Sequence, residues 1–145
     1  GERDWWNKNT LFERSCRAPL IVAGPEVKPG RARGLVEFVD LFPTIAEHCG
    51  VDRPEGLAGQ SLWPLLNNPA APGKDAAFTL VTRGPQQRGD SIRTDRWRYT
   101  EWSDGQRELY DHESDPEETQ NVVEANAKVA AELSAKLKAG PQQGG

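Results

Sequence analysis

The chain has 145 residues, of which 36% are hydrophobic and 28% are charged, and its net charge is −4. The length fits one domain, and the absence of a long basic segment argues against nucleic-acid binding. The apolar runs are about five residues long, whereas a membrane-spanning helix needs roughly 20 apolar residues. The chain contains no methionine, from which we expect that it was processed, excised from a longer protein, or built without its start.

Three apolar segments predict strands in the first half of the chain. Residues 18–23 (APLIVA) form an apolar run with β-branched residues, as is typical of a buried strand of a parallel or mixed sheet. Residues 35–39 (LVEFV) alternate in polarity and predict a second strand. Residues 76–82 (AAFTLVT) predict a third strand. Because a predicted helix follows the second strand, the pattern indicates an α/β unit.

The predicted helix begins after Asp40, whose carboxylate can accept hydrogen bonds from the first free backbone N–H groups. Pro43 is tolerated because it lies in the first turn, and Gly50 is expected to end the helix. The inward face of the helix is predicted to consist of Leu41, Ile45 and Ala46.

Shorter segments of alternating polarity follow in the second half. Residues 91–94, 97–102 and 107–110 predict the strands of a three-stranded antiparallel meander. Asp104 and Gly105 lie between the last two strands, where Asp-Gly is a hairpin signal. One packed face of the meander is predicted from Ile92, Trp97, Tyr99 and Leu109. After it, apolar residues at helical spacing predict a terminal helix at residues 122–137.

Few side chains suggest a catalytic or metal-binding role. Asp111 and His112 form a carboxylate–imidazole pair before a proline turn, and we interpret them as a solvated turn rather than a metal site. Two arginines flank Cys16, but the sequence places no histidine to act as its base, so a nucleophilic role is not predicted. Cys16 and Cys49 are interpreted as unpaired thiols.

Four motifs in a fixed order give a more specific indication. They are WNKNTLFE with RAPLIVAGP (within residues 6–25), VEFVDLFPTIAEHCGV (36–51), SIRTDRWRYTEW (91–102) and ELYDHESDPEETQNV (108–122). Together they resemble the C-terminal part of the sulfatase family, with the iduronate-2-sulfatase type as the nearest branch.

This resemblance implies an alkaline-phosphatase-like α/β fold and the hydrolysis of sulfate esters, here expected to be those of sulfated sugars. Members of the family use a formylglycine made from the cysteine of a C-x-P-x-R motif, and a calcium ion held by aspartates. Cys16 is not this cysteine, because Arg17, Ala18 and Pro19 follow it. The formylglycine and the calcium ligands are therefore expected on an N-terminal part that is missing from this chain, and the isolated chain is expected to be inactive.

The resemblance also implies a division of the chain. Residues 1–83 are expected to form the end of the main α/β domain, with its last strands and a helix. Residues 84–140 are expected to form a small antiparallel sheet packed on the terminal helix, and residues 141–145 a disordered tail. The implied partners are a sulfated carbohydrate and the missing N-terminal part, and the implied location is the periplasm or the exterior of the cell.

Lys8 is the candidate catalytic residue. The family has a GEH-x-x-x-W-x-K segment, which Gly1, Glu2, Trp6 and Lys8 match, while Arg3 stands where histidine is usual. The resemblance implies that Lys8 contacts the sulfate of the substrate, with Trp6 and Arg3 as further substrate-binding candidates. A compact ammonium group with three donors suits a tetrahedral oxyanion. Without the resemblance, Lys8 would be interpreted as a surface cation.

Two other functions stay open. The first is hydrolysis of phosphate or phosphonate esters by a sister enzyme of the same superfamily, which the missing N-terminal motif would decide. The second is a non-catalytic module that binds a sulfated glycan or a partner protein.

Overall fold

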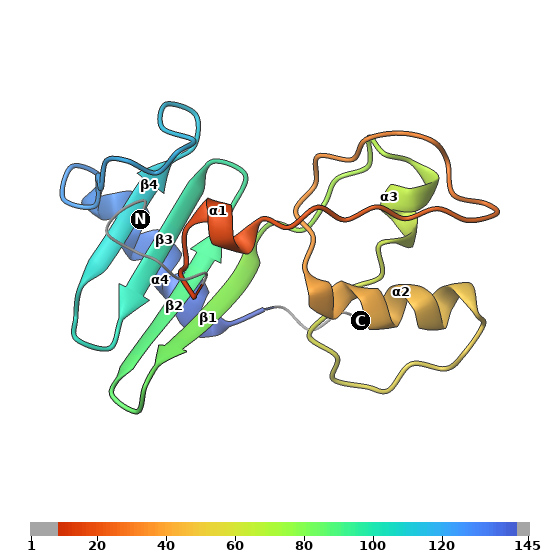
Figure 1. Cartoon of the computed structure of the whole chain (residues 1–145), viewed down its shortest axis with the longest axis horizontal. Coiled ribbons are helices and arrows are strands. Elements are labelled where there is room, and N and C mark those ends of the chain that lie inside the picture. The colour runs from red at the N-terminus through yellow and green to blue at the C-terminus, as the bar shows by residue number, and fades with distance from the viewer. Residues whose placement is uncertain (1–8, 142–145) are drawn as a thin grey trace. The chain divides into compact units, whose positions relative to one another are not determined.

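The computed structural model describes residues 9–141, which form two compact units (Figure 1). The first contains residues 9–19 and 78–138, and the second contains residues 20–77 and 139–141. Within these residues, no helix has both the length and the apolar composition that crossing a membrane requires. Positions 3, 6 and 8 of the predicted site and positions 142–145 of the predicted tail lie outside the described residues. The division predicted at residue 83 stays a prediction.

A four-stranded sheet with the strand order β1-β2-β3-β4 forms the centre of the first unit (Figure 1). The strands are β1 (Ala77–Arg83), β2 (Gln87–Arg93), β3 (Trp97–Trp102) and β4 (Arg107–Asp111). β2 pairs antiparallel with β3, and β3 pairs antiparallel with β4. The predicted meander is thus confirmed, but the sheet has four strands instead of three, because the strand predicted at residues 76–82 adds to its edge beside β2.

The register of the sheet builds its apolar core. Ile92 lies opposite Tyr99, and Tyr99 lies opposite Leu109, so the three side chains form one row across three strands. All three are fully buried, as the alternating pattern predicted. Trp97 is only half-buried, and the guanidinium group of Arg96 lies over its ring.

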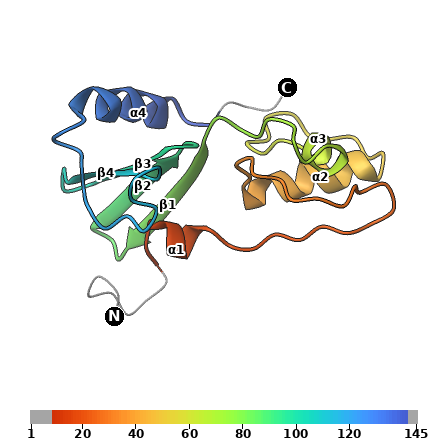
Figure 2. The ribbon, with the colours of Figure 1, turned by 90° about the horizontal axis from the view of Figure 1, so that it is seen from above.

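Helix α4 (Ala127–Ala139) covers one face of this sheet, and the short helix α1 (Glu13–Cys16) lies against the other face (Figure 2). The terminal helix was predicted to begin at residue 122, whereas residues 122–126 are not helical. The backbone N–H of Val122 donates to the carbonyl oxygen of Leu109, which holds this segment against β4 and delays the helix.

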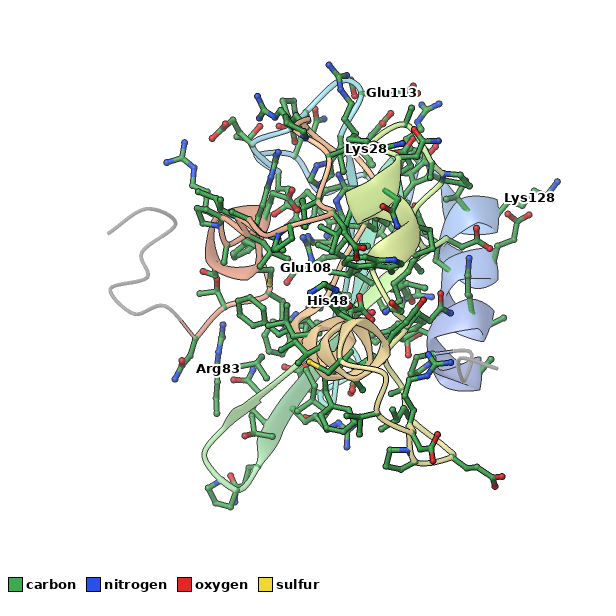
Figure 3. The ribbon with its side chains drawn as sticks, turned by 90° about the vertical axis from the view of Figure 1, so that its right-hand side faces the viewer. Lys28, His48, Arg83, Glu108, Glu113 and Lys128 are labelled. Atoms are coloured by element: carbon green, nitrogen blue, oxygen red, sulfur yellow. The ribbon has the colours of Figure 1, made fainter. Side chains whose placement is uncertain are left out.

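The second unit contains helix α2 (Leu41–His48), preceded by the 3-10 turn η2 (Phe38–Asp40), and helix α3 (Trp63–Asn67). His48, which Figure 3 labels at the end of α2, lies against Trp63 of α3, with ring centroids 4.7 Å apart. As predicted, Gly50 ends α2, with a left-handed φ of 64°. The N–H group of Gly50 donates to the carbonyl oxygen of Glu47, and that of Val51 donates to the carbonyl oxygen of Ala46, which is the pattern of a Schellman motif.

The inward face of α2 differs from the predicted one. Pro43, Thr44 and Ala46 are its buried residues, while Ile45 is 62% exposed. The face is set by a polar contact, because the hydroxyl oxygen of Thr44 accepts a 2.8 Å hydrogen bond from the backbone N–H of Leu62.

Asp40 also acts differently from the predicted cap. Its side chain makes no capping hydrogen bond to α2. Instead, the buried carboxylate accepts hydrogen bonds from the backbone N–H groups of Glu37 and Gln60 and from the ammonium group of Lys74. Asp40 therefore joins three loop segments of the second unit to one another.

The strands predicted at residues 18–23 and 35–39 are absent from the structure of the described residues. The first segment has no regular secondary structure, and its Ile21 is 90% exposed. In the second, Leu35 forms only an isolated bridge with Lys74. A strand requires hydrogen-bonded neighbours, and among residues 9–141 neither segment has a paired strand beside it.

Candidate functional site

The candidate site is the segment that follows Lys8. Lys8, Trp6 and Arg3 are outside the described residues, so their predicted contacts with a substrate stay predictions. The structure does describe residues 9–16, which come directly after Lys8, and these residues are anchored on the sheet face opposite α4 (Figure 2).

Apolar side chains make the first part of this anchor. Leu11 is buried beside Gly89, where an added Cβ would lie 2.7 Å from the Leu11 side chain and 2.6 Å from the ring of Trp102. The ring of Phe12 meets that of Tyr110 edge-on, with centroids 5.9 Å apart. Residues 9–16 can therefore approach the sheet this closely only because residue 89 is a glycine and has no side chain.

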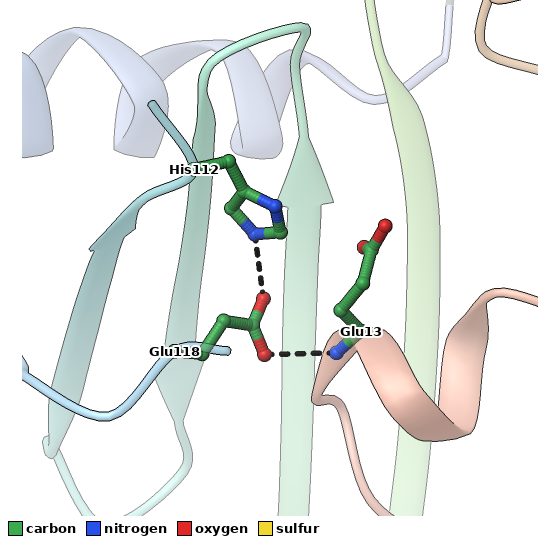
Figure 4. A group of neighbouring side chains, drawn as sticks. All are labelled: Glu13, His112 and Glu118. Atoms are coloured by element: carbon green, nitrogen blue, oxygen red, sulfur yellow. Dashed lines mark hydrogen bonds and ion pairs between the residues drawn. The ribbon is translucent and has the colours of Figure 1, made fainter. Parts of the chain in front are cut away.

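Glu13 makes the second part of the anchor through two separate connections. Its carboxylate oxygen Oε2 accepts from Arg98 Nη2 at 2.5 Å and from Arg93 Nε at 3.3 Å. Its backbone N–H donates to Glu118 Oε2 at 2.8 Å (Figure 4). Both the side chain and the main chain of this residue are thus fixed to the first unit.

Glu118 lies at the centre of the cluster and is 1% exposed. Its Oε1 atom accepts from Arg98 Nε at 2.6 Å. The same atom accepts from His112 Nε2 at 2.8 Å, as Figure 4 shows. Its φ of 56° is in the left-handed region, which costs a non-glycine residue about 1–3 kcal/mol. The contacts of its carboxylate hold the backbone in this conformation.

His112 is part of the same cluster, and its side chain is only 8% exposed, in contrast to the predicted solvated turn. Its Nδ1 atom lies 3.0 Å from Arg93 Nη2, which can only donate, so Nδ1 is the acceptor. Nε2 therefore carries the proton that it donates to Glu118. Asp111 lies outside the cluster and pairs with the guanidinium group of Arg96 at 2.7 and 2.9 Å.

The charges of the cluster balance. Burial raises the pKa of the Glu13 carboxyl, but the hydrogen bond and charge of Arg98, together with the charge of Arg93, outweigh burial and lower this pKa below its ordinary value. Burial also raises the pKa of Glu118, and the hydrogen bond from His112 and the charge of Arg98 again produce a net lowering. Both carboxylates are therefore ionised at neutral pH, opposite two guanidinium groups.

Ligand atoms of Glu13, His112 and Glu118 lie within 4.8 Å of one another, as in a metal site. A divalent cation does not fit here, because Arg93 and Arg98 already neutralise both carboxylates. Calcium also prefers about six or more oxygen ligands, and this cluster offers two carboxylates and an imidazole. The calcium ion that the sulfatase resemblance implies therefore has no suitable site in this cluster, which is an ion-pair network.

Cys16 has the environment of a structural thiol. Its Sγ atom lies 3.7 Å from the carbonyl oxygen of Thr10. Burial, the largest influence, raises the pKa of the thiol above its ordinary value, which disfavours the nucleophilic thiolate. Both Cys16 and Cys49 are free, as predicted.

The sequence motifs do not distinguish Glu13, Arg93, Arg98 or Glu118 from their neighbours. All four lie inside the quoted motifs, and this position is the one feature of the sequence that could have indicated a role for them. Arg98 stands between Trp97 and Tyr99 in an alternating strand, a pattern that indicates a solvent-facing charge, yet it is buried because residues 9–16 cover it.

Comparisons with known proteins agree with the motifs. A family model described as "N-sulphoglucosamine sulphohydrolase, C-terminal" matches residues 1–143. The arylsulfatase K of Xenopus laevis is 30% identical over 146 residues, which cover 90% of this chain and 27% of that protein. A solved putative sulfatase from Bacteroides thetaiotaomicron is 28% identical with a TM-score of 0.72, covering 80% of this chain and 27% of that chain.

Two further solved structures bear on substrate chemistry. A protein in complex with its substrate D-glucosamine-2-N,6-O-disulfate is 29% identical with a TM-score of 0.61, covering 68% of this chain and 22% of that one. The phosphonate monoester hydrolase of Agrobacterium radiobacter is 27% identical with a TM-score of 0.59, covering 72% of this chain and 25% of that one. The chain spans 27% of the length of the arylsulfatase K that it matches.

Proposed function

We propose that this chain is part of an enzyme that hydrolyses sulfate esters. The chain belongs to the family described as "N-sulphoglucosamine sulphohydrolase, C-terminal". The family match over residues 1–143 is the observation that carries this proposal. Family membership confirms the predicted resemblance to the C-terminal part of sulfatases, and the likeness to solved sulfatases confirms the α/β fold class. The iduronate-2-sulfatase branch stays a prediction.

The proposed substrate is a sulfated sugar. Support comes from the structural neighbour that binds a disulfated glucosamine. In this proposal Lys8 donates to a sulfate oxygen, and Trp6 and Arg3 contribute to substrate binding. An ammonium group suits this role because it is a compact donor that can neutralise the charge developing on the oxygen atoms as the S–O bond breaks.

The proposed nucleophile and metal are outside this chain. Neither cysteine of the chain stands in a C-x-P-x-R motif, and the cluster around Glu118 does not suit calcium. We place the formylglycine and the calcium site on the N-terminal part of the enzyme, and we propose that the whole enzyme acts in the periplasm or outside the cell.

The second unit supports a tight association with that N-terminal part. Apolar side chains are exposed along the segment at residues 18–23 and on α2, among them Ile21 at 90% and Ile45 at 62%. Patches of this kind mark interaction sites. We propose that the N-terminal part covers this apolar surface and supplies the strand neighbours that residues 18–23 lack.

A second candidate is a phosphonate or phosphate ester hydrolase, which the likeness to the phosphonate monoester hydrolase favours. The two can be separated by assaying the full-length protein with a sulfated glucosamine and with a phosphonate monoester, each with calcium added. The proposal expects release of inorganic sulfate from the sugar at the higher kcat/KM. Faster turnover of the phosphonate would establish the second candidate, and turnover of neither would favour a non-catalytic module.

A further inference from the structure

We infer that Glu13, Arg98 and Glu118 are positioning residues for Lys8, and that they act by fixing the main chain that follows it. The inference rests on the proposed contact between Lys8 and the sulfate. It assigns a role in turnover to a buried ion-pair network that touches no substrate.

The geometry of Glu13 carries the inference. Glu13 follows Lys8 by five positions (8 to 13), and it is bound through its side chain to Arg98 and through its backbone N–H to Glu118. One connection would leave the segment free to rotate about it, whereas two connections fix both position and direction. The buried Leu11 adds a third point between Lys8 and Glu13.

Both partners of Glu13 are buried residues of the first unit. Arg98 lies on β3, which has a paired strand on both sides, and its side chain is 3% exposed. Glu118 is held by Arg98 and His112 in a left-handed backbone conformation. The anchor therefore connects residues 9–13 to a central strand of the sheet.

A gain in folding stability alone does not explain why such a buried ion-pair network is present. Buried ion pairs are often no more stabilising than well-packed apolar residues of similar volume, because the charges must be desolvated. A sulfate contact, in contrast, requires its donor within a fraction of an ångström of the productive position, held by supporting residues. The network supplies such support at Glu13, five positions after Lys8 in the sequence.

A double-mutant cycle in the full-length protein tests the inference. The variants are Lys8→Ala, Glu13→Gln and the two combined, with kcat and KM measured on a sulfated glucosamine. We expect Glu13→Gln to lower kcat/KM by about 10- to 100-fold, the range in which small misplacements act. On the Lys8→Ala background the same change is expected to lower kcat/KM less than about twofold, because coupled residues do not act additively.

Asp90→Asn is the matched control. It also converts a carboxylate into an amide within an ion pair on the sheet, since Asp90 pairs with Arg88, and this pair is separate from the ion pairs that hold Glu13. It is expected to leave kcat and KM unchanged. Glu118→Gln serves as a second test variant if Glu13→Gln does not fold, with folding checked by circular dichroism.

The outcomes separate the inference from the proposed function. An equal loss from Glu13→Gln with and without Lys8 would mean that the network only stabilises the fold and would overturn the inference. Full activity of both Glu13→Gln and Glu118→Gln would overturn it as well. If Lys8→Ala itself had no effect, the proposed sulfate contact would be wrong, and the inference would fall with it.

Discussion

If Lys8 contacts the sulfate as proposed, its ammonium group interacts more strongly with the transition state than with the ground state, because negative charge moves onto the sulfate and leaving oxygens as the ester breaks. Lys8→Ala in the full-length protein is therefore expected to lower kcat and kcat/KM together by roughly 10²–10³-fold, the effect of losing one oxyanion donor. Lys8→Arg is not expected to restore the rate, since a planar fork replaces a point donor poorly.

Steady-state kinetics check this expectation, with calcium saturating and the formylglycine content measured by mass spectrometry. A change in KM alone would make Lys8 a general substrate anchor. Unchanged kinetics would mean that the match of WNKNTLFE to the lysine segment of the family is wrong.

A substitution at Gly89 tests the packing of Leu11 on the sheet. A Cβ at this position would lie 2.7 Å from the end of the Leu11 side chain and 2.6 Å from the ring of Trp102. Gly89→Ala is expected to displace Leu11 and to lower the free energy of unfolding by about 1–3 kcal/mol, as overpacking does. Gly24→Ala is the control, because the nearest atom to its new Cβ would be at 3.9 Å. Urea unfolding of both variants measures the difference, and equal midpoints would contradict this packing of Leu11.

Among the elements, the ion-pair network gives the first unit a specific acid sensitivity. The pKa values of Glu13 and Glu118 are lower in the folded chain than their ordinary values. Their contribution to stability is therefore fully present above the unfolded-state pKa of about 4.3. It is lost as the pH falls through the lower folded-state values, because protonation removes the pairing with Arg98.

Thermal melts between pH 7 and pH 3 measure this loss. The double variant Glu13→Gln with Glu118→Gln is expected to be less stable at pH 7 and to depend less on pH across this range. If the double variant had the same acid dependence as the natural chain, other carboxylates would account for it.

The elements also differ in how far the sequence predicts them. β2, β3 and β4 are joined by short turns and pair with one another, so alternating polarity and the Asp104-Gly105 turn were sufficient. Residues 18–23 have the composition of a buried strand, but the described residues offer them no paired strand, and we propose that the N-terminal part supplies it. The ion-pair network was missed because charges in an alternating strand look solvent-facing until a distant segment, residues 9–16, is placed over them.

For the whole molecule, the exposed apolar surface of the second unit sets the behaviour of the isolated chain. Unpaired apolar segments favour aggregation, and apolar side chains that stay exposed add no burial to stability. We expect the isolated chain to be marginal or partly molten. A sharp two-state melt above about 65 °C, beyond the usual range of mesophilic domains, would contradict this expectation.

The same surface predicts that one substitution acts differently in the fragment and in the full-length protein. Ile45 is 62% exposed in this chain, so Ile45→Ala is expected to change the stability of the isolated chain by no more than about 0.5 kcal/mol, as surface substitutions do. If the N-terminal part covers α2, the same change in the full-length protein deletes buried methyl groups and costs about 2–5 kcal/mol. Leu133→Ala is the control: Leu133 is already buried, so this variant should destabilise both forms. Urea unfolding of the six proteins measures the three pairs, and an equal effect of Ile45→Ala in fragment and full-length protein would show that α2 stays exposed in the complete enzyme.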